Sequence, residues 1–212
     1  MGDNPGSATE LDHLVARTGG LQPWRRIFHA ITGLVVAGLL VWAPLPQQPL
    51  ALALVIAAAG ALVLDLIRLR VPSVNRRFFR VLKPLASPRE ARGIASSSWF
   101  LVGVALTLLL FPGRVALAAI LVLALADPAA SYLGRRWGRI RFGSGTAEGS
   151  LTFLGVAACI LVPLGGWGPG AVTALLVSAI ERAPWPLDDN LTIPLVTGLL
   201  LWSLLPLGAP LV

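Results

Sequence analysis

An aspartate followed by a proline interrupts one of the long apolar stretches of this sequence. Asp127 and Pro128 stand inside residues 115–134, a stretch that is otherwise apolar. Because proline lacks an N–H, the carbonyl of Ala124 loses its usual helical partner, and inside a bilayer it needs another one. A carboxylate beside a freed carbonyl predicts a cation site. The alternative is a helix kink in which Asp127 pairs with one of the arginines that follow it.

A basic, glycine-rich stretch comes next, with the sequence GRRWGRIRFGSGTAEGS over residues 134–150. Glycines allow close approach of the backbone to an anion, and arginines can grip phosphate oxygens with two nitrogens at once. The stretch leads into another apolar segment, whose helix N-terminus would point its amides at the same anion. It is not a GxxxxGK[ST] phosphate loop. We expect a phosphate site formed by Arg135, Arg136, Arg139 and Arg141, with Glu148 as a nearby carboxylate.

Two aspartates and an asparagine precede the last apolar segment in PLDDNLTIP. Oxygen ligands of this kind favour Mg²⁺, which usually bridges substrate phosphates. One of Asp188, Asp189 and Asn190 is alternatively the N-cap of the final helix, since both residue types prefer that position.

Near the start of the chain, WRRIFH places two arginines immediately before an apolar segment and a histidine one turn inside it. His29 is a candidate base, or a contact for a phosphate or a lipid head group. The alternative is a buried histidine that only makes a hydrogen bond. Together, the metal ligands, the phosphate clamp and the apolar segments point to phosphoryl or nucleotidyl transfer to a lipid.

The composition requires these residues to be positioned by membrane helices. Of the 212 residues 56% are hydrophobic, and about 20 residues suffice to cross the hydrocarbon core. We predict an all-α, polytopic transmembrane helical bundle of about seven helices. The five longer segments are residues 27–45, 49–67, 94–112, 115–134 and 191–208, and the two shorter ones are 151–164 and 169–180. Six spans result if the short pair is a re-entrant hairpin.

Charge orients the bundle and excludes a nucleic-acid partner. Placing the N-terminus in the cytoplasm puts all of the 17 Lys and Arg residues except Arg114 on that face, as the positive-inside rule requires. The net charge of +7 is therefore an orientation signal. We expect a multi-pass protein of the cell membrane whose active site faces the cytoplasm and contacts membrane lipids.

Two cytoplasmic segments have amphipathic patterns. Residues 7–17 predict a short helix, so we divide the chain into a cytoplasmic N-terminal amphipathic segment (1–23) and a transmembrane domain (24–212). Residues 68–92 interleave eight basic residues with Phe78, Phe79 and other apolar side chains, a pattern typical of an interfacial helix on anionic head groups. The basic run is either a topology anchor or part of a site for an anionic substrate.

The central stretch resembles the CTP-dependent lipid kinase family, which includes dolichol kinase, phytol kinase and the CTP-using diacylglycerol kinases. The resemblance rests on ADPAASYLGRRWGRIRF and TAEGSLTFLGVA, with weaker similarities in WRRIFHAITG, SPREARGIASSSWFLVG and LDDNLTIPL, in the order of the family. It covers residues 24–195 and implies CTP as the phosphoryl donor, a divalent cation, and a lipid alcohol as the acceptor.

Site residues follow from this resemblance by position. It implies a nucleotide and phosphate site formed with the arginines above by Gly134, Gly138, Thr146, Gly149, Ser150 and Asn190. It adds substrate contacts from Arg25, Arg26, Glu90 and Arg92. Mg²⁺ would be held by Asp127, Glu148, Asp188 and Asp189, while Asp127 and His29 would be catalytic. Where the family has a phosphate-binding lysine, this chain has Gly145, and Arg139 or Arg141 could substitute for it.

We therefore predict CTP-dependent phosphorylation of a membrane lipid alcohol, such as a polyprenol, dolichol or phytol, with diacylglycerol also possible. Two alternatives remain open. A phosphatidate cytidylyltransferase would also join CTP to a membrane lipid, but the Lys/Asp/His/Gly-rich signature of those enzymes is missing. A non-enzymatic transporter would need polar residues through the full depth of the membrane, whereas the carboxylates here gather on one side.

Overall fold

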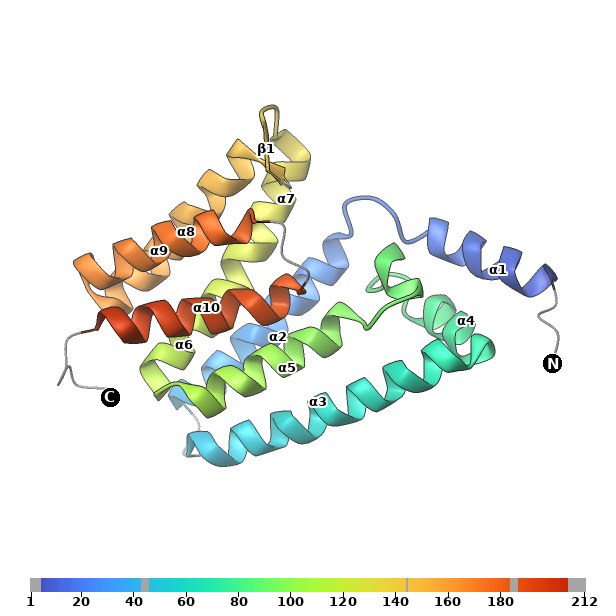
Figure 1. Cartoon of the computed structure of the whole chain (residues 1–212), viewed down its shortest axis with the longest axis horizontal. Coiled ribbons are helices and arrows are strands. Elements are labelled where there is room, and N and C mark those ends of the chain that lie inside the picture. Colours follow the sequence, from blue (N-terminus) through green and yellow to red (C-terminus); the bar gives the residue numbers. More distant parts are fainter. Residues whose placement is uncertain (1–4, 43–45, 144, 184–186, 206–212) are drawn as a thin grey trace.

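The computed structural model describes residues 5–42, 46–143, 145–183 and 187–205, and helices dominate them (Figure 1). All seven apolar segments form helices, which confirms the predicted all-α membrane bundle. They are α2 (Pro23–Trp42), α3 (Gln47–Arg70), α5 (Ser96–Leu110), α6 (Gly113–Leu121) continued by η2 (Val122–Ala126) and α7 (Asp127–Trp137), α8 (Ala147–Gly165), α9 (Trp167–Glu181) and α10 (Asp189–Leu204). Four of these, α2, α3, Gly113–Trp137 and α8, are long and apolar enough to span a bilayer.

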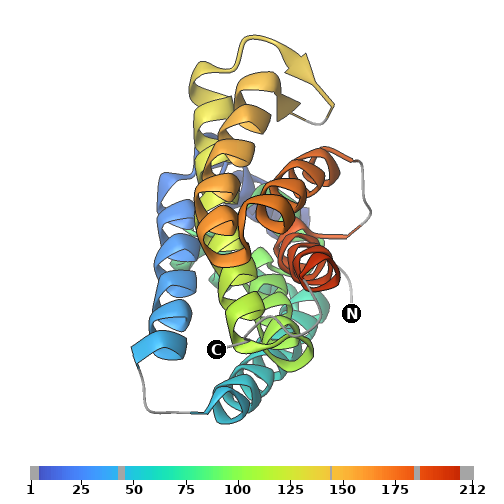
Figure 2. The same ribbon diagram turned by 90° about the vertical axis from the view of Figure 1, so that its left-hand side faces the viewer.

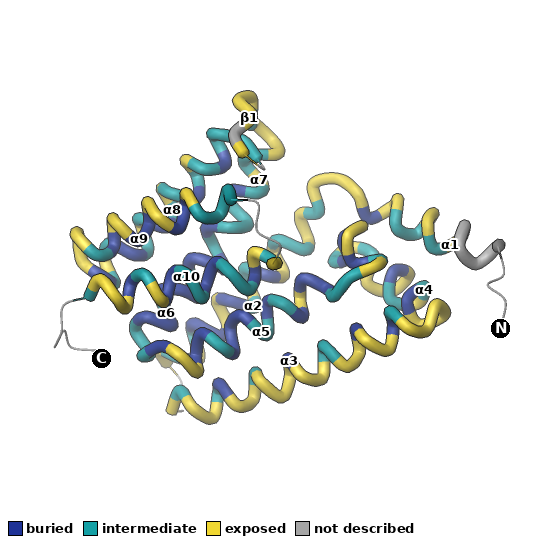
Figure 3. Tube along the Cα trace, viewed as in Figure 1, coloured by how far each residue is buried: buried dark blue, intermediate teal, exposed yellow. Residues whose placement is uncertain are grey.

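The helix formed by α6, η2 and α7 is the centre of the bundle. Within its most apolar window 61% of the residues are buried, against 17% for α3, and Figure 3 shows α3 exposed along most of its length. The side chains that α3 exposes include Leu52, Ile56 and Leu64. A peripheral helix with an apolar outer face is suited to lipid contact, because lipid chains are as apolar as leucine.

Small residues allow the helices to cross closely. A Cβ added to Gly33 of α2 would overlap the side chain of Ala124 in η2, and one added to Gly103 of α5 would overlap the backbone carbonyl of Asn190 in α10. Such small-residue contacts let backbones approach without a side chain between them. The second contact fixes the first turn of α10 against α5.

The shorter elements lie at one end of the bundle. The amphipathic helix α1 (Pro5–Ala16) packs against α4 (Pro72–Val81), where Glu10 forms ion pairs with Arg80 at 2.7 Å and Arg76 at 3.6 Å. A 3₁₀ turn, η1 (Pro88–Ala91), precedes α5. Figure 2 shows α7 and α8 side by side, and they are joined by an antiparallel hairpin of β1 (Arg141–Phe142) and β2 (Gly145–Thr146).

Candidate active site

A polar cavity of about 370 Å³ opens where α2, η1, α7 and α10 meet. Its lining includes four arginines and four carboxylates, and these are the residues that could handle a charged substrate. They are Arg25, Arg26, Arg89 and Arg135, with Glu90, Asp127, Asp188 and Asp189. His29 and Asn190 also line it. We call this space the polar cavity.

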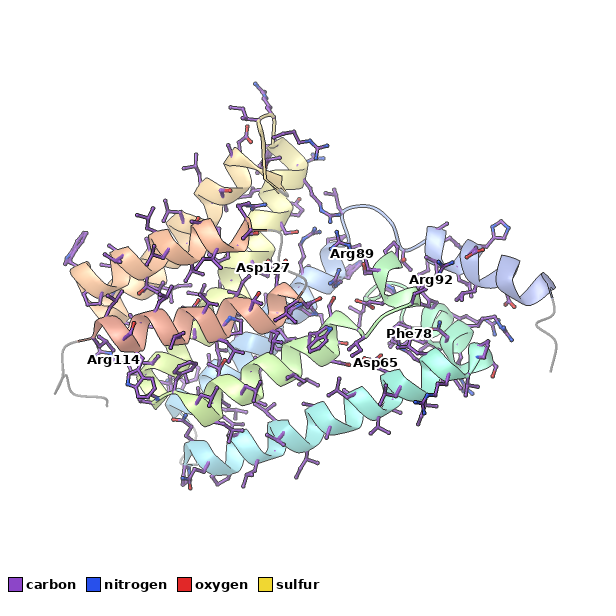
Figure 4. The ribbon with its side chains drawn as sticks, viewed as in Figure 1. Asp65, Phe78, Arg89, Arg92, Arg114 and Asp127 are labelled. Atoms are coloured by element: carbon purple, nitrogen blue, oxygen red, sulfur yellow. The ribbon has the colours of Figure 1, made fainter. Side chains whose placement is uncertain are left out.

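The position of Asp127 depends on a π-helical segment. The sequence predicted that Pro128 would break or kink the helix at this point, but η2 widens the helix just before Asp127 and α7 continues from it. A π-turn absorbs the missing N–H of proline without ending the helix, and such turns often mark functional sites. Asp127 is half-buried and faces the polar cavity from the central helix (Figure 4).

The first turns of α2 supply the basic side of the cavity. Arg25 donates to Ser96 Oγ and to Gln22 Oε1 (3.2 Å), and its Nη2 lies 3.9 Å from Glu90 Oε1. Arg26 donates to Ser131 Oγ on α7 through Nη2 (2.9 Å), whereas its buried Nη1 has no hydrogen-bond partner among the described residues. A buried donor without a partner costs free energy. An anionic ligand that accepts from Arg26 Nη1 would remove this cost, so the cavity favours such a ligand.

His29 lies one turn further along α2, on the same side as Arg25. It is buried, and its ring centroid is 5.2 Å from that of Phe100. It lines the polar cavity, so both its catalytic and its structural interpretations stay open.

The loop of residues 87–96 carries Arg89 and Glu90 into the cavity and is held by a buried ion pair. Asp65 accepts from Arg68 and from the backbone N–H of Ala95 (2.9 Å). Arg68 in turn donates to the Glu90 carbonyl (2.6 Å) and the Gly93 carbonyl (2.7 Å). A carboxylate and a guanidinium this deeply buried are stable only when paired and hydrogen-bonded. The Asp65–Arg68 pair therefore anchors the loop to α3.

The N-terminus of α10 closes the cavity on the acidic side. Asp188 is its N-cap, and its Oδ1 accepts from the Asn190 N–H (3.0 Å) and side-chain amide (2.6 Å). The capping alternative therefore describes what Asp188 does. Asp189 has no such role among these hydrogen bonds and lines the cavity. The positive end of the helix dipole also lies here.

The described residues of the glycine-rich loop (138–143, 145 and 146) and the start of α8 are not among those that line the polar cavity. Glu148 accepts from the backbone N–H groups of Arg139 (2.9 Å) and Ile140 (3.4 Å), so the structure does not bring it together with Asp127. The side chains of Arg92, Arg136, Arg139 and Arg141 are exposed and are not among those that line the cavity.

The small residues of this stretch have packing roles. Thr146 caps α8 by accepting from the Gly149 N–H (3.2 Å), and a Cβ on Gly134 would lie 2.9 Å from the Thr146 hydroxyl. A Cβ on Gly138 would overlap the same threonine. Ser150 donates to the Thr146 carbonyl (3.3 Å). The glycines therefore allow α7 and α8 to pack closely, and their predicted role in phosphate binding stays a prediction.

An arginine that the sequence did not single out lies over Gly145. The guanidinium of Arg182 fills the space that a Cβ at this position would need, and its Nε lies 2.7 Å from Glu181 Oε2. Arg182 thus puts a positive charge beside the position where the family pattern has a lysine. Its signal in the sequence was only a charge at the end of an apolar segment.

Several cavity residues escaped prediction, namely Gln22, Ser87, Arg89, Ser96 and Ser131. Arg89 stands beside Glu90, which the sequence did indicate, and that adjacency was the available signal. The hydroxyl and amide side chains carry no charge pattern, so only their three-dimensional neighbours identify them.

The carboxylates of the polar cavity are candidate ligands for Mg²⁺. Among the described residues no group of three His, Cys, Asp or Glu side chains could hold a metal by itself. Mg²⁺ needs less than this, because it commonly uses one or two carboxylates together with substrate phosphates and water. Asp127 and Asp189 line a cavity that also contains arginines, and this donor set fits a metal ion that arrives with a nucleotide.

Comparison with known proteins identifies the family of this chain. No protein-family model matches the chain, and no solved structure matches it. A CTP-dependent diacylglycerol kinase 1 of Schizosaccharomyces pombe is 30% identical over 162 residues, which cover 66% of this chain and 74% of that protein. The chain belongs to the CTP-dependent lipid kinase family.

Two further relatives extend the similarity over a larger share of this chain. The CTP-dependent diacylglycerol kinase 1 of Eremothecium gossypii is 26% identical over 85% of this chain and 66% of its own length. That of Saccharomyces cerevisiae is 25% identical over 82% of this chain and 70% of its own length.

Proposed function

We propose that this lipid kinase transfers the γ-phosphoryl group of CTP to the hydroxyl group of a membrane lipid alcohol in the polar cavity. The observation that carries the proposal is the gathering of Asp127, four arginines and the α10 N-terminus around one cavity of a membrane bundle. Diacylglycerol is the first acceptor to test, because the relatives are named for it. Polyprenol, dolichol and phytol are the further candidates.

In this mechanism the lipid oxygen attacks the γ-phosphorus and forms the new P–O bond. The bond from the γ-phosphorus to its bridging oxygen breaks, and CDP leaves with the electron pair. Asp127 accepts the hydroxyl proton, while Arg25, Arg26, Arg89 and Arg135 hold the phosphate oxygens in place. Mg²⁺, when bound, supplies charge neutralisation on the transferred group. Such catalysis consists mainly of positioning and electrostatics.

We also propose that the cavity faces the cytoplasm, with residues 1–23 as a cytoplasmic segment and residues 24–212 as the kinase domain. Arg114 lies at the end of the bundle opposite to Arg89 and Arg92 (Figure 4). Four arginines, including Arg89, line the cavity, and an excess of basic residues is expected on the cytoplasmic side, which supports this orientation. CTP would reach the cavity from the cytoplasm and the lipid from the inner leaflet.

The experiment that tests this function follows two labels on CTP in detergent micelles with Mg²⁺. We expect label from the γ-phosphate to enter diacylglycerol or one of the isoprenoid alcohols, with CDP as the second product. Label from the α-phosphate in the lipid, with release of pyrophosphate, would instead establish the cytidylyltransferase alternative. Absence of transfer to every acceptor would contradict the proposed function.

A further inference from the structure

An apolar groove of about 440 Å³ lies between α3, α4 and the start of α5, on the far side of the loop 87–96. Most of its lining is apolar, and two of its polar residues, Asp65 and Arg68, already bind each other and the backbone. Its apolar lining is formed by Ala61, Leu64, Ile67, Val74, Phe78, Val81, Leu82 and Ala95. We call this space the α3–α4 groove.

The groove and the polar cavity are joined by a third space of about 280 Å³, the connecting chamber. The chamber shares Phe78, Leu82 and Ser97 with the groove. With the polar cavity it shares Arg25, His29 and Glu90. The three spaces therefore adjoin one another in sequence, and their lining changes from apolar to charged. Figure 4 shows Asp65 and Phe78 beside α3 and α4, and Asp127 on the central helix.

The groove opens where a bilayer would change from chains to head groups. Leu64 and Ile67 are exposed in the last turns of the 24-residue apolar helix α3. Immediately after them, α4 carries Arg76, Arg77 and Arg80 together with apolar side chains. A helix of that pattern lies in the interface plane. A lipid in the inner leaflet could thus enter the groove sideways without leaving the bilayer.

We infer that the α3–α4 groove holds a hydrocarbon chain of the acceptor lipid, whose hydroxyl end reaches the polar cavity through the connecting chamber. This inference rests on the proposed function and adds the acceptor's binding site to it. The occupant is the acceptor and not a bulk phospholipid, because the groove adjoins the chamber that shares Arg25, His29 and Glu90 with the polar cavity. Binding of the chain also fixes the direction from which the hydroxyl approaches the phosphate.

Kinetics of a narrowed groove test the inference. Ala61→Trp puts a large ring into the groove, and Ala59→Trp puts the same ring on an exposed part of α3 outside it. We expect Ala61→Trp to raise the KM for a long-chain acceptor about tenfold. The added ring overpacks the space of the acceptor chain, and the binding free energy lost in this way corresponds to about that factor. The KM for CTP and the use of a short-chain acceptor should stay near wild type, as should all parameters of Ala59→Trp. An unchanged KM for the long-chain acceptor would overturn the inference.

Photo-crosslinking tests the groove without relying on turnover. A diacylglycerol with a photoreactive group at the end of one acyl chain should label residues 61–82, and unlabelled diacylglycerol should compete. Labelling confined to other helices, or equal competition by phosphatidylcholine, would overturn the assignment to the acceptor. Because this readout needs no kinase activity, failure of the proposed function and failure of the groove give different results.

Discussion

Replacement of Asp127 by asparagine is expected to lower the rate of phosphoryl transfer by about 10²- to 10⁴-fold, the usual contribution of a general base. Asparagine has nearly the same shape, but it cannot take the proton of the lipid hydroxyl. Asp127 also lies at the meeting point of α2, α7 and α10. Among the described residues of the central helix, it is the one carboxylate that lines the cavity. The measurement is initial velocity with labelled CTP at saturating acceptor.

The matched control is Asp12→Asn, which removes an exposed carboxylate from α1. It should retain wild-type velocity. Thermal unfolding in detergent should show similar midpoints for both variants, so that lost activity reports chemistry and not misfolding. Wild-type velocity of Asp127→Asn would refute its role as the base.

The second large effect is a loss of stability when the buried Asp65–Arg68 ion pair, which anchors the loop 87–96, is broken. We expect Asp65→Leu to destabilise the protein by about 3–5 kcal/mol, because Arg68 is left as a buried charge without its partner. Arg68→Leu should cost at least as much, since the carbonyls of Glu90 and Gly93 also lose their donor. Unfolding in mixed micelles measures these free energies.

The double variant Asp65→Leu/Arg68→Leu should cost less than the sum of the two single changes, because the residues form one network. Glu10→Gln serves as the control, since it breaks the more exposed ion pairs of Glu10 with Arg76 and Arg80 and should change stability by less than about 1 kcal/mol. Additive costs, or losses near those of Glu10→Gln, would show that the pair does not anchor the loop.

The five longer helices were predictable because apolar segments of about 20 residues suit a membrane helix. Residues 115–134, for example, were recognised as one segment although Asp127 and Pro128 interrupt them. What the sequence did not indicate was the π-turn of η2 that keeps this helix continuous. A π-turn depends on how neighbouring helices satisfy the backbone, and composition does not reveal it.

The candidate site was only partly predictable. The residues that the sequence and the family resemblance indicated and that line one cavity are Arg25, Arg26, Glu90, Asp127, Asp188 and Asp189. Their chemical roles stay predictions. The basic run after Asp127 suggested that Arg139 and Arg141 would join them. Instead, the β1–β2 hairpin and the bond from Glu148 to the Arg139 N–H hold that loop apart from the cavity. Contacts across ten residues fold this loop onto itself, and the pattern of charged residues in the sequence does not indicate such contacts.

Comparing Arg26→Lys with Arg139→Lys tests most directly whether the polar cavity binds the phosphates of CTP. Both changes keep the charge and remove the planar, two-pronged donor that suits phosphate. Arg26 has a buried Nη1 that has no hydrogen-bond partner among the described residues, whereas Arg139 is exposed in the glycine-rich loop. We expect Arg26→Lys to raise the KM for CTP about tenfold and Arg139→Lys to leave it unchanged. A raised KM for CTP in Arg139→Lys alone would contradict this placement of the active site.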